Sequence, residues 1–230
     1  MELKKGTKLF RYDLELPPIG WDNNYRNQEY ASINFDGYRK NHLGFFFFFD
    51  NEEVTYNTAR IACMKSKNSN FYFTQTDINR NIKLLDLTGC SDPLLMFKKL
   101  KDADIDVLNN HYHIYTSRGT PSFEILRSVV NYNLSIDINP LDRKTEIVQR
   151  NVTLLQSYLS LAGYPYTFLG QLLTDYANGK AFKKELISKG FDGYCFDESI
   201  GGHTFCLLNS EDLSNPQTNI VNIKKYEKLY

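Results

Sequence analysis

The stretch that decides the fold is Lys189-Gly-Phe-Asp-Gly-Tyr-Cys-Phe-Asp-Glu-Ser-Ile-Gly-Gly-His-Thr-Phe-Cys-Leu-Leu-Asn209. Within it, the segments 194–196 and 204–208 have the apolar patterns of buried or half-buried strands. Gly201 and Gly202 between them permit a tight turn at positive φ. We therefore expect two strands joined by a polar loop, which either carries chemistry or is an ordinary solvated hairpin end. That loop presents Asp197, Glu198, Ser199 and His203.

A second strand is expected near the start of the chain, over residues 7–12, because it begins after a glycine and ends before two prolines. Its period of two predicts that Leu9 and Arg11 share one face. Phe10 and Tyr12 should then share the other face.

Five consecutive phenylalanines, Phe45 to Phe49, predict a central strand buried on both faces. The polar residues 19–43 before it predict a long surface loop with little regular structure. Asp50 with Glu53 three residues later is a capping-box pattern, which predicts a helix over 54–67. The expected buried positions of this helix are Val54, Ala59, Ile61, Ala62 and Met64.

The remaining chain predicts further strands at 71–74 and 82–87, then helices, then closing strands. Helical spacing of apolar residues covers 92–110, 121–132, 144–162 and 167–189. Gly190 should end the last helix, and a weak strand is expected around 220–223. Strands and helices alternate too rarely for a doubly wound parallel sheet, so the sequence favours an α+β fold with an inserted helical block.

The composition excludes several classes of protein. Twenty-seven basic residues balance 27 acidic ones, so no global field attracts nucleic acid or an anionic membrane. The four cysteines form no C-x-x-C pair and are expected to be reduced core residues. Residues 1–7 lack the apolar core of a signal peptide, and the longest apolar run, 45–49, is too short to span a bilayer. We expect a cytoplasmic protein, or an exported effector without a cleaved signal peptide.

Motifs for other familiar chemistries are missing: there is no P-loop, G-x-G-x-x-G, G-x-S-x-G or H-E-x-x-H. His111 and His113 could share a strand face, but no trio of ligands completes a site, so no metal is expected. Cys195 with His203 and Asp192 could form a nucleophile, base and orienter. A cysteine in an apolar strand is more often an inert core residue.

Arg11 on a short apolar strand faces either solvent or an anion at the sheet. A guanidinium suits the oxygens of a phosphate, while an aromatic face suits nicotinamide and a carboxylate suits ribose hydroxyls. Arg11, Tyr12, the phenylalanine strand and the Asp197–Glu198 loop are therefore the residue types needed to hold a dinucleotide. The alternative is an ordinary surface arginine.

These segments resemble, in order and spacing, the ADP-ribosyltransferase superfamily of bacterial toxins and their relatives. The features that carry the resemblance are Leu9-Phe-Arg-Tyr12, Gly44 to Asp50 with the following Thr58-Ala59, Leu84-Leu-Asp-Leu87, Lys189-Gly-Phe-Asp-Gly193 and Thr204 to Asn209. They cover residues 5–90 and 186–213. The resemblance implies a single domain over 1–230, with a split antiparallel sheet and a helical insertion at about 92–185.

The resemblance also implies a site. Arg11 would bind a phosphate or ribose of NAD, Phe47 and Phe48 would line the nicotinamide pocket, and Tyr12 would be a further NAD-binding residue. Glu198 would be the glutamate that stabilises the positive charge developing at C1′ as nicotinamide departs. Many relatives carry that glutamate at the start of the last strand, where this chain has His203 and Thr204. His203 is therefore placed among the NAD-binding residues.

The implied activity is mono-ADP-ribosylation of a protein or nucleic acid, with NAD as the substrate. Two alternatives stay open: an NAD glycohydrolase, and a recognition module without catalysis that uses the same cleft.

Overall fold

The computed structural model describes residues 1–21, 29–31, 38–40, 45–90, 99–105, 176–197 and 201–226. The chain divides into two compact units, one made of 1–88 with 186–230 and the other of 89–185. The second unit has nearly the bounds of the predicted insertion, and 99–102 and 176–185 within it are helical. The helices predicted at 121–132 and 144–162 lie outside the described residues.

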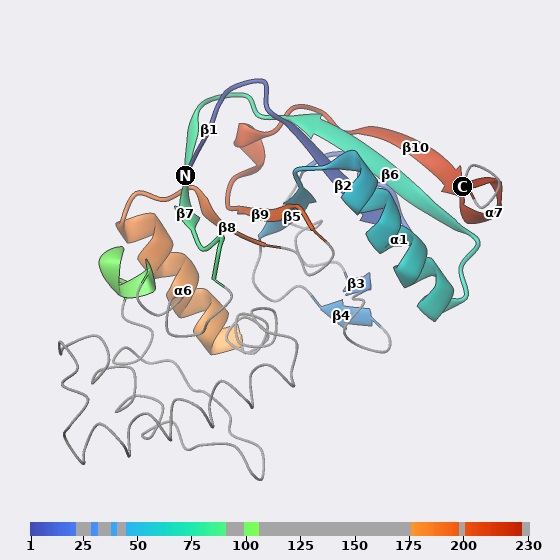
Figure 1. The fold of residues 1–230 in the computed structure, drawn as a ribbon. Helices are drawn as coiled ribbons and strands as arrows, with labels where there is room; N and C mark the ends of the chain where they lie inside the picture. Colours follow the sequence, from blue (N-terminus) through green and yellow to red (C-terminus); the bar gives the residue numbers. More distant parts are fainter. Residues whose placement is uncertain are drawn as a thin grey trace, which may run out of the picture. The chain divides into compact units, whose positions relative to one another are not determined.

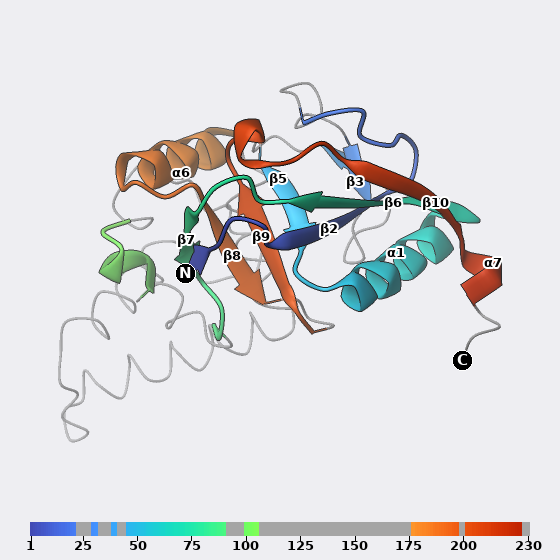
Figure 2. The same ribbon diagram turned by 90° about the horizontal axis from the view of Figure 1, so that it is seen from above.

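The first unit is built on an eight-stranded sheet in the order β1-β7-β8-β9-β5-β2-β6-β10 (Figures 1 and 2). Its strands are β1 Glu2–Leu3, β2 Lys8–Asp13, β5 Phe46–Phe49, β6 Asn70–Asp77, β7 Ile82–Asp86, β8 Gly193–Asp197, β9 His203–Leu207 and β10 Gln217–Asn222. Only β7 and β8 pair in parallel; the other neighbours are antiparallel. This mixed, mostly antiparallel sheet confirms the α+β class.

The phenylalanine strand β5 lies between β9 and β2 and is therefore central, as predicted. Phe46 and Phe48 are fully buried on one face. They belong to a cluster that includes Leu9, Cys195 and residues of β1, β7 and β9. Phe47 and Phe49 are only half-buried on the opposite face, so the prediction of complete burial on both faces was wrong. We call the face of Phe48 face A and the face of Phe47 face B.

The sheet is weakly joined at its centre. β2 pairs with β5 through the single register pair Phe10↔Phe49, whereas β2 with β6 and β5 with β9 pair over six and four residues. The next residues along the two strands, Arg11 and Phe48, do not form a further register pair. The sheet thus consists of two well-paired parts that meet at one point.

Helix α1, Glu52–Ser66, covers face B of β2 and β6. Its N-cap is Asn51, whose Oδ1 accepts from the backbone N–H groups of Glu53 (2.8 Å) and Val54 (3.3 Å). The prediction of Asp50 as N-cap was therefore wrong by one residue; Asp50 accepts instead from the N–H of His203. The buried positions are Thr55, Thr58, Ala59, Ala62 and Cys63, so Met64, which is 67% exposed, was also predicted wrongly.

The prediction of an irregular loop over 19–43 needs correction in its described parts. Trp21 is buried in the core, where its ring contacts Phe46 and Phe48 edge-on at 5.9 and 5.1 Å. Two short strands, β3 Glu29–Ala31 and β4 Tyr38–Lys40, pair as an antiparallel ribbon. The intervening residues lie outside the described ranges.

The closing elements follow the prediction. Helix α6, Tyr176–Ser188, is capped by Gly190, whose φ is +72°. The N–H of Gly190 donates to Ile187 and that of Phe191 to Leu186, the two bonds of a Schellman cap. Gly201 and Gly202 turn between β8 and β9 at φ values of +93° and +76°. A 3-10 turn, η2 Ser210–Asp212, then leads to β10 and the short helix α7, Ile223–Tyr226.

All four cysteines are free thiols and buried, in agreement with the prediction of reduced core residues. No helix in the described part of the chain is long and apolar enough to cross a membrane.

Candidate functional site

The predicted site residues lie on neighbouring strands but divide between the two faces. Arg11 alternates with the buried Leu9 and so lies on face A, where Phe48 and His203 also lie. Tyr12 lies on face B, where its ring stacks on Phe49 at 6.2 Å. Phe47 shares face B because it alternates with Phe48. The structure thus brings Arg11, Phe48 and His203 to one face and places Tyr12 and Phe47 on the other.

Arg11 is held by Asp13, two residues further along the same strand face. Nε of Arg11 donates to both carboxylate oxygens of Asp13 at 3.1 Å, and Nη2 donates to Oδ1 at 2.8 Å. Both side chains are only 11% exposed. This bidentate and largely buried contact fixes the plane of the guanidinium. Sequence reasoning missed Asp13, although an acid at i+2 on a strand shares the face of residue i.

His203 also lies on face A, on β9 two strands away from Arg11, and between two carboxylates. Its Nδ1 is 2.9 Å from Oδ1 of Asp197 on β8, and its Nε2 is 4.0 Å from Oδ2 of Asp50. Asp50 also holds the backbone of His203: its Oδ1 accepts from the N–H of His203 at 2.9 Å, and its own N–H donates to the carbonyl of His203 at 3.1 Å. These contacts with Asp197 and Asp50 fix the imidazole in place. Its side chain is still 39% exposed, so solvent can reach it.

The turn before His203 brings the chain close to Asp50. A Cβ built on Gly202 would lie 2.8 Å from Oδ1 of Asp50 and 3.1 Å from a methyl of Val54. Glycine at this position therefore permits the short approach that lets the Asp50 carboxylate reach the N–H of His203. Glu198, the predicted catalytic glutamate, lies outside the described residues, directly after Asp197.

Arg11 and His203 are separated by two strand spacings and by two residues along the strands. At ~4.8 Å between strands and ~3.4 Å per residue, their Cα atoms lie roughly 12 Å apart. Phe48 lies between them but is fully buried beneath Trp21, so it shapes the face rather than meeting solvent. Face A therefore presents a sheltered arginine–aspartate pair and a histidine between acids, on either side of the sheet's single-pair junction.

The alternative thiol site is not assembled. Cys195 is buried, and its Sγ lies 3.6 Å from the carbonyl of Leu85. Asp192 binds Arg80 and the N–H of Lys83, and the partner of His203 is Asp197 instead. Among the other thiols, burial raises the pKa of Cys63 to about 11, which keeps that sulfur protonated at neutral pH.

Two residues of the predicted closing signature, Asp192 and Asn209, belong to a network around Arg80 and Asp212. Nε of Arg80 donates to Asp212 at 2.6 Å, and its Nη2 bonds Asp212 and Asp192 at 3.0 and 2.7 Å. Asn209 Nδ2 donates to Asp212 at 3.4 Å. The Asp212 side chain is 1% exposed, and desolvation raises its pKa although Arg80 opposes that shift. Asp192 and Asn209 therefore have a structural role, because they connect the loops that carry Arg80 and Asp212.

Gly193 is also structural. A Cβ at this position would lie 2.0 Å from the carbonyl oxygen of Cys206 on β9, closer than any side chain can approach. The close approach of β9 therefore requires glycine at this point of the signature.

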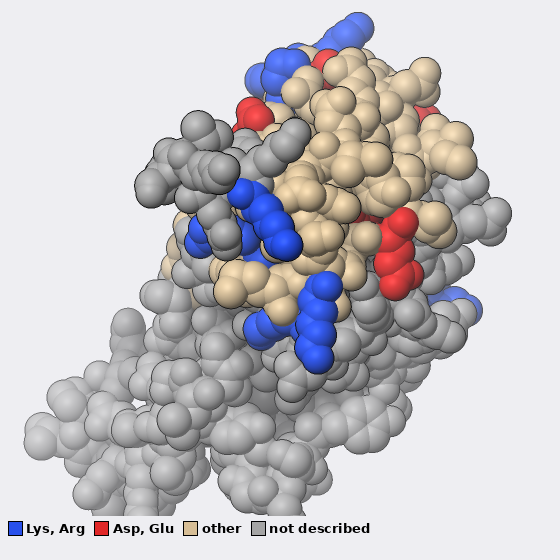
Figure 3. Space-filling view, turned by 90° about the vertical axis from the view of Figure 1, so that its right-hand side faces the viewer, with Lys and Arg blue, Asp and Glu red and all other residues tan. Residues whose placement is uncertain are grey.

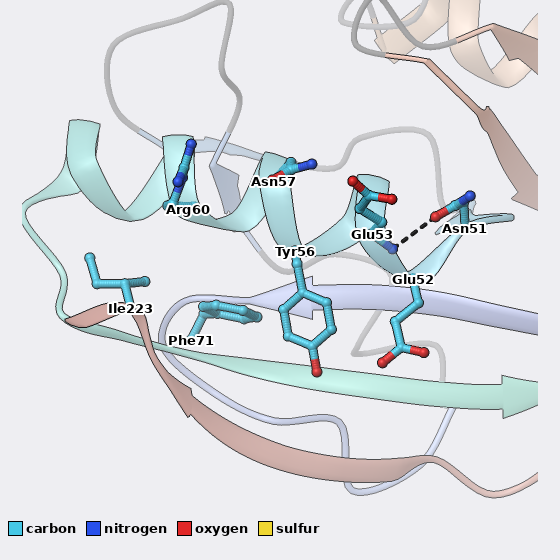
Figure 4. Close-up of a pocket in the computed structure, with 8 residues that line it drawn as sticks. All are labelled: Asn51, Glu52, Glu53, Tyr56, Asn57, Arg60, Phe71 and Ile223. Carbon is cyan, nitrogen blue, oxygen red and sulfur yellow. Dashed lines mark hydrogen bonds between the residues drawn. The ribbon is translucent and has the colours of Figure 1, made fainter. Parts of the chain in front are cut away.

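A separate groove of about 630 Å³ runs beside the first half of α1 (Figure 4). Tyr56 and Phe71 form its aromatic part, and the Glu52 carboxylate extends beside the Tyr56 ring. The residues that line it are Asn51, Glu52, Glu53, Tyr56, Asn57, Arg60, Phe71 and Ile223. None of them is a predicted site residue, so the groove and the face A constellation are distinct candidates.

Within the described ranges, no group of three or more His, Cys, Asp or Glu side chains is arranged to hold a metal ion. His111 and His113 lie outside those ranges. Comparisons of the chain with protein-family models, with curated proteins and with solved structures give no match.

Proposed function

We propose that the protein cleaves the nicotinamide–ribose bond of NAD and transfers ADP-ribose to a protein or nucleic-acid acceptor. The observation that carries this proposal is the single register pair between β2 and β5, directly beside Arg11. A sheet that is paired at only one central point can admit a ligand between its two parts. The split antiparallel sheet implied by the resemblance would have this property.

The two polar groups of face A suit the two ends of such a ligand. Arg11 would meet the diphosphate, with Asp13 holding the guanidinium plane in a fixed direction. His203 and Asp197, roughly 12 Å away across the strands, would meet the hydroxyls of the nicotinamide ribose. Tyr12 and Phe47 lie on face B, so their proposed role is limited to supporting the strands from behind.

In the proposed reaction the bond between C1′ and the nicotinamide nitrogen breaks, and nicotinamide leaves with the electron pair. The ribose then carries an oxocarbenium-like charge, which a carboxylate placed beforehand stabilises. Glu198 remains the proposed carboxylate, and Asp197 beside it is a described carboxylate that is 41% exposed. The acceptor nucleophile forms the new bond to C1′ and loses its proton; when water is the nucleophile, the same site is a glycohydrolase.

The experiment is nicotinamide release from NAD by the wild type, Arg11→Ala and Glu198→Gln. Arg60→Ala is the matched control, because Arg60 is an exposed arginine of the α1 groove and not of face A. We expect turnover to be lost in the first two variants and kept in the control. Mass spectrometry of candidate acceptors after incubation with NAD then separates transfer from hydrolysis.

A recognition module without catalysis is the second candidate. It is favoured by the Arg11–Asp13 pair, since a sheltered arginine that already binds a carboxylate can serve a structural role alone. A wild-type protein that neither turns over nor binds NAD would support this candidate and would refute the enzyme. Turnover that survives Arg11→Ala would place the chemistry elsewhere on the molecule.

A further inference from the structure

The two ends of the eight-stranded sheet differ. One edge is β1, which has only two residues and is followed by Lys4 and Lys5. The other is β10, which has six residues, and no described strand lies beyond it in Figures 1 and 2. Proteins usually shorten, charge or cover such edges because an open strand is a template for pairing with another chain.

Pro216 precedes strand β10 and Lys224 follows it, but the six residues of the strand itself carry neither device. Its sequence, Gln217-Thr-Asn-Ile-Val-Asn222, contains no charged residue and no proline. Ile220 is 68% exposed, on the face opposite the α1 side. Figure 3 views this end of the molecule, where the described surface is mostly uncharged and Lys, Arg, Asp and Glu occur in separate small groups.

The register shows which backbone groups point outward. The N–H of Ile223 donates to the carbonyl of Ser69, and this bond continues the register of β10 with β6. Antiparallel ladders alternate, so the odd-numbered residues of β10 bond to β6. The N–H groups of Thr218, Ile220 and Asn222 therefore point away from the sheet, together with the carbonyls of Thr218 and Ile220.

We propose that a second copy of this chain pairs with β10, antiparallel, with Ile220 opposite Ile220 of the partner subunit. In this register the outward N–H and carbonyl of Ile220 bond those of the partner's Ile220. The N–H of Asn222 meets the carbonyl of the partner's Thr218, and the symmetric bond forms on the other side of the axis. A two-fold axis perpendicular to the sheet generates this arrangement and joins the two sheets into one.

A second copy fits better than an unrelated strand because the edge is complementary to itself. The only side chains directly opposed on face A are Ile220 with Ile220 of the partner subunit and Thr218 with the partner's Asn222. The first pair covers an exposed aliphatic group, and no like charges oppose each other. The 27 basic and 27 acidic residues of each chain also cancel, so no net repulsion acts between copies.

The test is the molar mass in solution over a concentration series, by sedimentation equilibrium, for the wild type and three variants. Ile220→Pro removes one outward N–H and no bond to β6, and Ile220→Lys places two positive charges opposite each other. We expect a dimer for the wild type and loss of the dimer in both variants. Ile187→Lys is the matched control because Ile187 is also exposed, at 57%, but lies outside the edge; it should remain dimeric. Circular dichroism checks that each variant is folded.

Hydrogen exchange gives a second readout that needs no variant. The amides of Ile220 and Asn222 should gain protection as the protein concentration rises, while those of Asn219 and Val221, bonded to β6, stay protected throughout. A wild type that is monomeric at all concentrations would overturn the proposal. A dimer that persists in folded Ile220→Pro, or an edge protected only when an extended peptide is added, would overturn it too.

Discussion

At the scale of single residues, Gly193 makes the sharpest prediction. Gly193→Ala should lower the free energy of unfolding by about 3 kcal/mol, because the new Cβ collides with the carbonyl of Cys206. The matched control is Gly201→Ala. No atom lies within 4 Å of the new methyl group at this position, so its only cost is the strain of an alanine at positive φ. It should cost about 1 kcal/mol. Urea unfolding followed by circular dichroism measures both, and equal losses would contradict the clash.

From the buried position of Asp212 we predict that the free energy of unfolding depends on pH. Its pKa is raised by burial, so the folded protein binds this proton more tightly than the unfolded chain does. The stabilisation is therefore full below the ordinary pKa of an aspartate and is lost as pH rises through the raised value. Asp212→Asn removes this contribution, so the stability of the wild type minus that of the variant should fall as pH rises through that window.

The measurement is urea unfolding of both proteins at several pH values on either side of that window. Glu211→Gln, which removes an exposed charge from the same 3-10 turn, is the control for loss of charge alone. A difference between the wild type and Asp212→Asn that is constant with pH would show that Arg80 balances the cost of burial, and a difference that rises with pH would show that Arg80 outweighs it.

At the scale of elements, helix α1 depends on its cap. Asn51→Ala should cost about 1 kcal/mol, since two N–H groups of the first turn lose their acceptor. Asn57→Ala is the matched control in the exposed middle of the helix, where alanine should be neutral or stabilise by a few tenths of a kcal/mol, on the order of its better propensity. Thermal unfolding compares the variants, and equal melting temperatures would exclude the cap as a contributor.

The capping error shows what sequence could and could not predict. Asp50 and Asn51 are both good N-cap residues, so local propensity alone does not choose between them. The choice depends on His203, 153 positions away from Asp50, whose N–H takes the Asp50 carboxylate. By contrast, Gly190, Gly201 and Gly202 were placed correctly because their role is local backbone geometry.

The candidate site was predictable to a similar degree. Alternation along β2 correctly put Arg11 with Leu9, and the same rule contained the signal for Asp13. Nothing in the sequence pointed to the Arg80–Asp212 contact, because those residues are 132 positions apart and belong to no shared pattern. Trp21 was missed because polar neighbours on its C-terminal side concealed a single buried ring.

At the scale of the whole first unit, side-chain packing compensates for the weak backbone junction. The face A core includes residues from both parts of the sheet, with Phe48 beside the point where β2 and β5 stop pairing. Phe48→Ala should therefore cost about 3–5 kcal/mol. Phe47→Ala, the adjacent half-buried position on face B, is the control and should cost less, about 2 kcal/mol. Equal costs would mean that both faces hold the junction.

The position of Trp21 has a practical consequence. It is the one tryptophan of the chain, it is 8% exposed, and its indole N–H donates to the carbonyl of Ser214 at 2.7 Å. All indole fluorescence therefore arises from one ring seated on Phe46 and Phe48. Its emission should move to longer wavelength when water reaches that core, and a nicotinamide ring brought close to face A should quench it. The protein thus carries its own optical probe for unfolding and for ligand titration, without any added label.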